Sequence, residues 1–438
     1  MVTARWKYAV ILFAAGVAGI AACVANDFAD GQFACNPDGE AACPPGLLCA
    51  RDGLCRTRDL ADAQGPVVPP DAPAEASDGA TEQAPDASEA GDACASATWA
   101  LLTDAHAPFG VALGDDGRLY VSGQSSSEGW VAELDTCDGG VVREKTFAVP
   151  GTTTPTVNVL LATPTAVLGC GGGAQPDALA GTIDKALTTP AFSAVTGSGF
   201  SGFNGIAVAT DGAMWVSGNK QLFATPQQGW VVRTTAPKCE ATLGVGTAIA
   251  QGPSGSMYVM VDSAGGTSQV SLIDPACAVG ATVGPPLAVG TSISTSSLLV
   301  QSGVLYAGGT AMATGNNRFV FLAALDLATK VWTVTPLDPN PLEPDILNGA
   351  VTDTSAFFLG VTQRAGFGTG TATIYRFDPP YTKTSIPAAI TLPFGALQLA
   401  ARSLAVAPAG QDGVYIVGGS IDGTGGIARC RKSGDCSH

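Results

Sequence analysis

A unit of four short apolar segments, which recurs along most of the chain, is the feature that most constrains the fold. Its clearest copy runs from Gly110 to Phe147 and contains the segments VAL, LYVSG, WVAELD and VVREKTF, separated by turn residues. The first two segments are joined by Asp116-Gly117, a strong short signal of a hairpin between antiparallel strands. This copy therefore predicts a four-stranded antiparallel sheet.

The third segment of the unit occurs in seven copies along the chain, at a spacing of about 49 residues. After WVAELD the copies are LAGTID, GWVVRT, QVSLID, FLAALD, TIYRFD and IARCR. The second segment recurs in register with them, with a glycine hairpin before it at Gly117, Gly212, Gly255, Gly303 and Gly413. Repetition at this period predicts an all-β fold, a seven-bladed β-propeller of four-stranded antiparallel blades over residues 94–438.

These repeats resemble the bacterial seven-bladed β-propeller repeat family, whose unit reads approximately G-x-x-Y-V-x-G followed by F-V-A-x-L-D. The resemblance is carried by GRLYVSG with WVAELD, AMWVSG with GWVVRT, and VLYAGG with FLAALD. It implies architecture alone. The chain departs from the quinone-cofactor propellers because it has no A-x-D-x-x-T-G-x-x-x-W docking motif, and no cofactor is expected.

The two ends of the repeat region predict how the ring closes. The seventh copy stops at His438 without a fourth strand, whereas the strand that begins at Cys94 has no blade before it. We expect this N-terminal strand to complete the last blade, with a Cys94–Cys436 disulfide in place of the missing hairpin. That bond would close a loop of about 340 residues and contribute roughly 5 kcal/mol. Cys170 and Cys430 align with apolar strand positions and are expected to be buried thiols.

Residues 1–22 predict a lipoprotein signal peptide. A basic start with Arg5 and Lys7 precedes an apolar run of about fourteen residues, shorter than the ~20 that a transmembrane helix needs. Ile20-Ala21-Ala22-Cys23 resembles a bacterial lipobox, which implies that Cys23 becomes the lipidated first residue. Ordinary cleavage after Ala22 is the alternative. By resemblance to the sorting rule of enteric bacteria, the next residue, Val24, permits the outer membrane.

Residues 23–57 form a predicted cysteine-rich module, with Cys35, Cys43, Cys49 and Cys55 at spacings of eight, six and six. In an exported chain this predicts two disulfides of open connectivity. Zinc is the rival, but the module has neither histidine nor a C-x2-C pair, so no metal is expected. The module resembles cysteine-rich stretches that follow the lipobox in surface proteins of myxobacteria. Residues 58–93 predict an acidic, disordered linker rich in alanine and proline.

Charge excludes one class of partner. Charged residues make up 13% of the chain and its formal net charge is −16. Nine acids and no bases lie between Asp59 and Asp92. No stripe of lysine and arginine interleaved with aromatic residues is present, so nucleic-acid binding is not expected. The expected partners are a membrane, through the lipid anchor, and a glycan or an envelope protein, with the chain itself monomeric.

A ligand would meet the propeller on one face, around the central channel. The loops from each fourth strand to the next first strand gather there, as do the loops between the second and third strands. Amides at Asn204 and Asn348 are expected there, and the candidate ligand-binding residues are Asp104, His106, Glu128, Glu343, Asp345, Arg364 and Arg402. No catalytic residue is assigned, since a triad would have His106 alone and no G-x-S-x-G elbow. A glycosidase pair from Glu128, Glu343 or Asp345 depends on a separation that the sequence does not give.

Two repeated residue types have structural interpretations. Asp135, Asp184, Asp274, Asp326 and Asp378 each end a third segment before a turn, where an aspartate side chain can bond its own backbone. Trp130 and Trp230 begin third segments and are expected to pack between blades rather than to bind sugars.

The sequence therefore predicts a non-catalytic lipoprotein of the outer membrane or cell surface, whose propeller binds a glycan or a protein. Two alternatives stay open. One is a hydrolase or lyase acting on polysaccharides, in which a hydrolase would use the carboxylates named above and a lyase would use His106 with Arg364 or Arg402. The other is a periplasmic scaffold for envelope assembly, which would present an apolar or edge-strand surface to a protein.

Overall fold

The structure is a computed structural model that forms two compact units, Met1–Glu82 and Gln83–His438. It describes residues 48–49, 55–56, 97–103, 106–173, 178–195, 200–221, 228–263, 266–313, 318–336, 343–352, 357–364, 370–378, 388–391, 400–408, 411–419 and 425–436. In the first unit these form a hairpin of β1 (Leu48–Cys49) and β2 (Cys55–Arg56), with Cys49 opposite Cys55. Cys23, Cys35, Cys43 and Cys94 lie outside the described residues.

The described residues of the second unit include four separate four-stranded antiparallel sheets. The first comprises β4 (Ala107–Leu113), β5 (Leu119–Ser125), β6 (Glu128–Leu134) and β7 (Val141–Phe147). The second comprises β21 (Ser292–Gln301), β22 (Val304–Met312), β23 (Arg318–Asp326) and β24 (Trp332–Pro336). The third comprises β25 (Glu343–Thr352), β26 (Phe357–Arg364), β27 (Gly370–Phe377) and β28 (Ala388–Thr391). The fourth comprises β29 (Ala400–Val406), β30 (Val414–Gly419), β31 (Gly425–Cys430) and β3 (Trp99–Thr103).

The other strands of this unit form one eight-stranded and one five-stranded sheet. The eight-stranded sheet comprises β8 (Thr156–Ala162), β9 (Ala166–Gly172), β10 (Ala178–Asp184), β11 (Pro190–Val195), β12 (Phe200–Val208), β13 (Met214–Gln221), β14 (Gln228–Arg233) and β15 (Cys239–Leu243). The five-stranded sheet comprises β16 (Val245–Gln251), β17 (Met257–Asp262), β18 (Thr267–Ile273), β19 (Val279–Thr282) and β20 (Leu287–Ala288).

The fold is thus all-β and propeller-like, but the predicted closed ring of seven equal four-stranded blades is wrong. Two local features account for the difference. Gly172 of β9 pairs with Gly202 of β12, and this bridge merges two repeats into one curved sheet. Gly284-Pro285-Pro286 interrupts the outer strand of the five-stranded sheet, so that β19 and β20 pair separately with β18.

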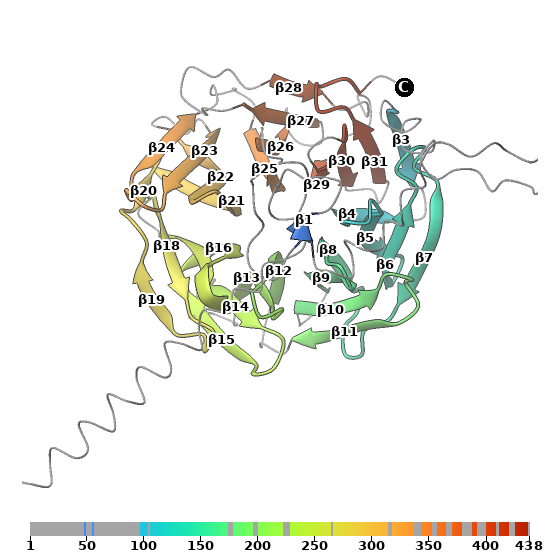
Figure 1. The fold of residues 1–438 in the computed structure, drawn as a ribbon, viewed down its shortest axis with the longest axis horizontal. Helices are drawn as coiled ribbons and strands as arrows, with labels where there is room; N and C mark the ends of the chain where they lie inside the picture. The colour runs from blue at the N-terminus through green and yellow to red at the C-terminus, as the bar shows by residue number, and fades with distance from the viewer. Residues whose placement is uncertain are drawn as a thin grey trace, which may run out of the picture. The chain divides into compact units, whose positions relative to one another are not determined.

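Figure 1 shows the sheets of the second unit following one another around a common centre, with β4, β8, β12, β16 and β29 among the inner strands. The predicted pairing of the N-terminal strand is present, because β3 pairs antiparallel with β31, from Trp99–Arg429 to Thr103–Gly425. Four of the five predicted glycine turns have the expected backbone conformation, and Gly413 does not. Gly117, Gly212, Gly255 and Gly303 have positive φ, a conformation that glycine adopts without steric cost.

The core lies between successive sheets. Trp99 and Tyr415 of the last sheet pack with Val121 and Trp130 of the first, in one buried cluster. Leu305 and Phe321 of β22 and β23 share another cluster with strands of the five-stranded sheet. The one helical element among the described residues is a 3-10 turn, η1 (Pro253–Gly255). Over that same part of the chain, no helix has the length and apolar character needed to cross a bilayer.

Candidate functional site

The candidate site is the channel between the inner strands, and a recurring backbone irregularity defines it. A register shift interrupts the pairing of each inner strand with its second strand: between Pro108 and Gly110 in β4, Val157 and Val159 in β8, Phe203 and Gly205 in β12, Val245 and Ala248 in β16, Thr295 and Ser297 in β21, Ile346 and Ala350 in β25, and Ala401 and Ser403 in β29. Such bulges leave residues unpaired and re-aim their side chains, and they are frequent beside functional sites. Among the unpaired residues are Asn158, Asn204 and Ser296, which we call the bulge collar. Arg402 holds the corresponding position in β29, and its side chain lies outside the described part of the structure.

The glycine that ends the second segment of the repeat lies opposite the bulge, and its small size has a steric reason. In β5, β9 and β13 this residue is Gly123, Gly171 or Gly218, the final glycine of segments such as LYVSG. A Cβ there would lie 1.9 Å from the carbonyl oxygen of Ala107, 2.0 Å from that of Thr156, or 1.9 Å from that of Gly202. Any larger residue would therefore collide with the strand that carries the bulge. The recurring glycine is the sequence signal from which the collar could have been predicted.

Below the collar the channel holds two cavities with apolar walls. The first, of about 340 Å³, is lined by residues of β4, β8, β12, β16, β21 and β29, and it includes Asn204 and Ser296 of the collar. The second, of about 610 Å³, extends toward Thr210 and Gln251. Both are lined by Leu161, Ile206, Ile249, Leu298 and Leu299. The described lining residues of the two cavities contain no charged side chain.

Polar atoms gather at the collar end. Asn204 is exposed, and Ser296 Oγ is buried without a hydrogen-bond partner among the described residues. The five-stranded sheet, which precedes β21 in the chain, holds the bulge of β21 in place through Asp262, a buried residue at the end of β17. Its carboxylate accepts a hydrogen bond of 3.1 Å from the backbone N–H of Thr295 and another from Ser268 Oγ. Burial raises the pKa of Asp262, and the two hydrogen bonds partly oppose this shift.

His106 lies against the first sheet rather than among the channel-lining residues. Its ring stacks on Trp130, with centroids 4.6 Å apart and planes 13° from parallel. His106 Nε2 is 3.4 Å from Glu144 Oε2, which also accepts a hydrogen bond of 3.0 Å from Trp130 Nε1. His106 Nδ1 is buried and makes no hydrogen bond to the described part of the chain.

The other predicted ligand-binding residues fall in three places. Glu343 and Arg364 are opposite each other in β25 and β26, and Asp345 is opposite Thr362. Glu128 begins β6 opposite Ser125, and Arg402 holds the bulge position of β29. Asp104 lies outside the described residues, as do the side chains of Glu343, Asp345, Arg364 and Arg402. The structure therefore brings Glu343 and Arg364 to neighbouring strand positions and places His106 on a different sheet.

Both tryptophans at the start of third segments are packing residues, which confirms their interpretation. Trp130 and Trp230 have exposed fractions of 1% and 0%. The arrangement around Trp130 has a counterpart at Trp230, whose Nε1 donates a hydrogen bond of 2.9 Å to Glu240 Oε2. The ammonium group of Lys220 lies 5.2 Å from the centroid of the Trp230 ring. In each case a carboxylate of the fourth strand orients a buried indole.

Four of the five aspartates at the strand ends act as predicted, as acceptors within turns. Asp378 accepts a hydrogen bond of 2.9 Å from Arg376 Nε, and the residues that follow it lie outside the described part of the chain. Asp135 accepts from the N–H of Cys137 at 2.7 Å, Asp274 from that of Ala276 at 2.9 Å, and Asp326 from that of Ala328 at 2.8 Å. Asp184 accepts from the N–H of Thr189 at 2.6 Å, and hydrogen bonds from Thr188 and Thr189 lower its pKa to about 2. Among the described residues, no group of three or more histidine, cysteine or acidic side chains is placed to hold a metal ion.

The cysteine pairing differs from the prediction. Cys436 is bonded to Cys430, six positions away, so the predicted Cys94–Cys436 bond and the predicted free thiol at Cys430 are both wrong. The turn after β31 brings the two Cα atoms within 4.4 Å, a short-range contact that alignment of the repeats does not reveal. Cys137 is also disulfide-bonded. Cys170 is a buried free thiol, as predicted.

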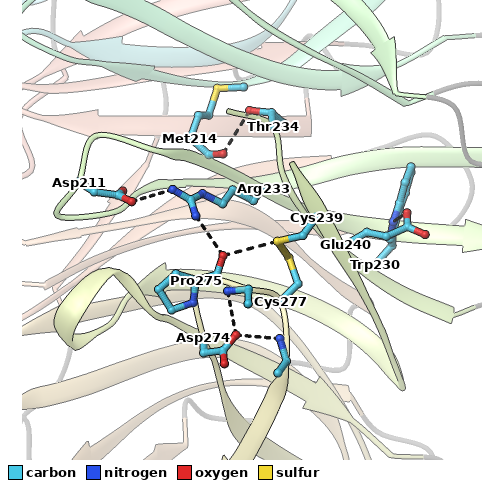
Figure 2. Close-up of a disulfide and its surroundings, with 12 residues drawn as sticks. Asp211, Met214, Trp230, Arg233, Thr234, Cys239, Glu240, Asp274, Pro275 and Cys277 are labelled. Atoms are coloured by element: carbon cyan, nitrogen blue, oxygen red, sulfur yellow. Dashed lines mark hydrogen bonds and ion pairs between the residues drawn. A yellow bond between two sulfur atoms is a disulfide. The ribbon is translucent and has the colours of Figure 1, made fainter. Parts of the chain in front are cut away.

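A second disulfide joins the eight-stranded sheet to the five-stranded sheet. Figure 2 shows Cys239, at the start of β15, bonded to Cys277 in the turn after β18. Beside it, Arg233 donates to Asp211 Oδ2 at 2.7 Å and to the carbonyl oxygen of Pro275 at 3.0 Å. The disulfide and the arginine thus hold the same turn of the neighbouring sheet.

Comparison with known proteins finds solved structures that resemble this chain in fold. No family model and no curated protein matches the chain. A structure of the Dos1 propeller has 9% sequence identity and a TM-score of 0.44, covering 76% of this chain and 94% of its own. Sqt1 from Chaetomium thermophilum has 16% identity and a TM-score of 0.45, covering 79% of this chain and 86% of its own.

Proposed function

We propose that this chain is a non-catalytic binding module, exported and held by an acyl anchor at Cys23 on the outer membrane or cell surface. The acidic linker of residues 58–93 would separate the module from the membrane by about 30 to 35 Å if it behaves as a flexible coil. The module would bind an envelope protein or a glycan.

One observation carries the binding role: the inner strands all give up regular pairing at the bulge collar. Unpaired residues cost hydrogen bonds within a sheet, and bulges are treated as designed features because they re-aim side chains. The collar presents amide and hydroxyl groups at Asn158, Asn204 and Ser296. These groups donate and accept hydrogen bonds without a charge, which suits sugar hydroxyls or a peptide backbone.

Retention and turnover measured together test this function. The chain would be immobilised and exposed to envelope polysaccharides and to an outer-membrane extract, with bound material and new polysaccharide chain ends as the two readouts. We expect retention without new chain ends. New chain ends that disappear in Glu343→Gln or His106→Gln would instead establish the hydrolase or lyase. Absence of any retention would contradict the binding role.

The anchor has its own test. In cells fed a labelled fatty acid, the chain should take up label and fractionate with the outer membrane, whereas the Cys23→Ser variant should do neither. Equal labelling of the two chains would exclude Cys23 as the lipidated residue.

A further inference from the structure

We propose that the apolar channel is a binding site for a single-chain aliphatic amphiphile with a small uncharged polar head. The inference rests on the proposed binding function and names a ligand class for the channel. It is carried by the order of the two cavities along the strands, by the chemistry of their walls, and by the polar collar at one end.

The cavities follow each other along the inner strands. On β12 the first is lined by residues 204–206 and the second by residues 206–208, and Thr210 in the turn after β12 also lines the second. On β21 the first is lined by residues 296–299 and the second by residues 298–300. From Asn204 to Val208, where β12 ends, an extended strand spans about 13 Å, and Thr210 follows two residues later. A membrane acyl chain occupies one leaflet, about half of a ~30 Å hydrocarbon core, so it fits this length.

The walls select an aliphatic chain. Leu161, Ile206, Ile249, Leu298 and Leu299 contribute to both cavities and come from four different strands, so apolar side chains face the channel from several directions. The volumes of about 340 and 610 Å³ lie in the range of small-molecule sites, which are mostly apolar with a few polar groups to fix orientation. Burying an aliphatic chain there gains about 25 cal/mol for each Å² removed from water.

The collar selects the head. Asn204 is exposed at the end of the first cavity, and Ser296 Oγ is a buried hydroxyl whose hydrogen-bonding capacity is unused within the described chain. A ligand hydroxyl or ester group would satisfy these groups. A charged head would be desolvated without an opposite charge among the described lining residues, which costs far more than burying a neutral polar group. The unsatisfied hydroxyl of Ser296 places the head at the collar, and the tail runs along Ile206, Ile249 and Leu298, which line both cavities.

The test is equilibrium dialysis of the full chain with radiolabelled 1-monododecanoylglycerol, below its micelle concentration. The chain would carry Cys23→Ser, so that no acyl group of its own competes. We expect saturable binding of one equivalent and much weaker binding of dodecanoate, whose tail is the same. No saturable binding, or tighter binding of dodecanoate, would overturn the proposal.

Two variants locate the ligand, and a third serves as control. Ile206→Trp should obstruct both cavities and weaken binding at least tenfold. The same replacement at Val141, an exposed residue on β7 with an exposed fraction of 57%, should leave binding unchanged. Asn204→Ala should fold, since Asn204 is exposed, and should weaken binding by about three- to tenfold through loss of a head contact. Unchanged binding in both channel variants would exclude this site.

Failure of this inference can be told apart from failure of the proposed function. If the immobilised chain retains an envelope protein or glycan but takes up no monoacylglycerol, the channel assignment is wrong and the binding role stands. If Ile206→Trp abolishes uptake of monoacylglycerol while retention of the envelope partner persists, the channel binds the amphiphile and the macromolecular partner uses another surface.

Discussion

Arg429 and Thr136 lie 293 positions apart in the chain, and Nη1 of Arg429 donates a hydrogen bond of 3.2 Å to the carbonyl oxygen of Thr136. The same oxygen accepts a hydrogen bond of 3.1 Å from Trp99 Nε1. Both donors belong to the last sheet and the acceptor follows the third strand of the first sheet. The two ends of the repeat region are therefore joined through one backbone carbonyl.

The Arg429 contact recurs elsewhere in the unit. Arg233 on β14 donates to the carbonyl oxygen of Pro275 at 3.0 Å, and Arg376 on β27 donates to that of Lys432 at 2.9 Å. Each acceptor lies in the turn after the third strand of the following sheet. In the sequence the arginines appear at one register of GWVVRT, TIYRFD and IARCR. An arginine at this position of the repeat therefore marks a link between neighbouring sheets.

Replacing Arg429 with methionine should lower the free energy of unfolding by about 2 to 4 kcal/mol, because hydrogen bonds from a charged group contribute about 1.5 to 3 kcal/mol each. Arg429 is 4% exposed, and its other Nη donates to the carbonyl oxygen of Asp412 at 2.7 Å. Arg376→Met should cost less, since its side chain is 28% exposed and its carboxylate partner Asp378 is in solvent. Urea unfolding of both variants measures the difference. Equal losses would mean that burial does not set the strength of these links.

Replacing Gly218 with alanine should destabilise the chain by about 1 to 3 kcal/mol, the usual cost of overpacking. The new Cβ would lie 1.9 Å from the carbonyl oxygen of Gly202 and 2.7 Å from Phe203 Cα, both of them backbone atoms at the bulge. Gly202→Ala is the matched control, because nothing lies within 4 Å of its Cβ position. It should change stability by less than about 1 kcal/mol, in the stabilising direction. Thermal unfolding of the two variants measures the effect, and similar midpoints would refute the steric role of Gly218.

The Cys239–Cys277 and Cys430–Cys436 disulfides should differ in their contributions to the free energy of unfolding. Cys239–Cys277 spans 38 residues and Cys430–Cys436 spans six. In the chain-entropy model, loops of these lengths give about 4 and about 2 kcal/mol. The double variants Cys239→Ser with Cys277→Ser, and Cys430→Ser with Cys436→Ser, would be compared by urea unfolding under non-reducing conditions. A larger loss from the shorter loop would show that local contacts outweigh loop entropy at these bonds.

Local sequence signals predicted what depends on neighbouring residues. The strands, the glycine hairpins and the aspartate turns are properties of short segments, and burial of Trp130 follows from its place in an apolar strand. The merging of two repeats at Gly172 and Gly202 depends on how closely two backbones approach, which no segment encodes alone. Alignment of the repeats predicts a bond from Cys436 to Cys94, whereas the turn after β31 brings Cys436 to Cys430.

The channel was harder to foresee than the strands, because register between paired strands is a tertiary property. Its position is nevertheless encoded in the glycine that ends segments such as LYVSG, since only glycine tolerates the carbonyl of the bulged strand. Asn204 and Arg402 were expected on the binding face from their place in the repeat, and both occupy bulge positions. His106 was expected with them, but its stacking on Trp130 places it on the first sheet.

Asp262 should make the stability of the chain fall as pH rises through the weakly acidic range. Burial raises its pKa above the ordinary value of 3.8, despite the hydrogen bonds from Ser268 and Thr295. Between 3.8 and the raised pKa, the folded chain holds a proton that the unfolded chain has released. The free energy of unfolding then decreases with pH, by at most about 1.4 kcal/mol per pH unit, and levels off above the folded pKa.

Asp262→Asn removes this titration, so the stability of the native chain relative to the variant should decline as pH rises above 3.8 and level off above the raised pKa of Asp262. Asp326→Asn is the control of opposite sign, because backbone hydrogen bonds from Thr329 and Ala328 lower the pKa of Asp326. Its contribution is present above the ordinary aspartate pKa and is lost as pH falls. Urea unfolding of the three chains on both sides of the ordinary aspartate pKa, from about pH 2 to about pH 8, measures both effects. Parallel profiles for the native chain and Asp262→Asn would show that Asp262 ionises in the folded protein as it does in the unfolded one.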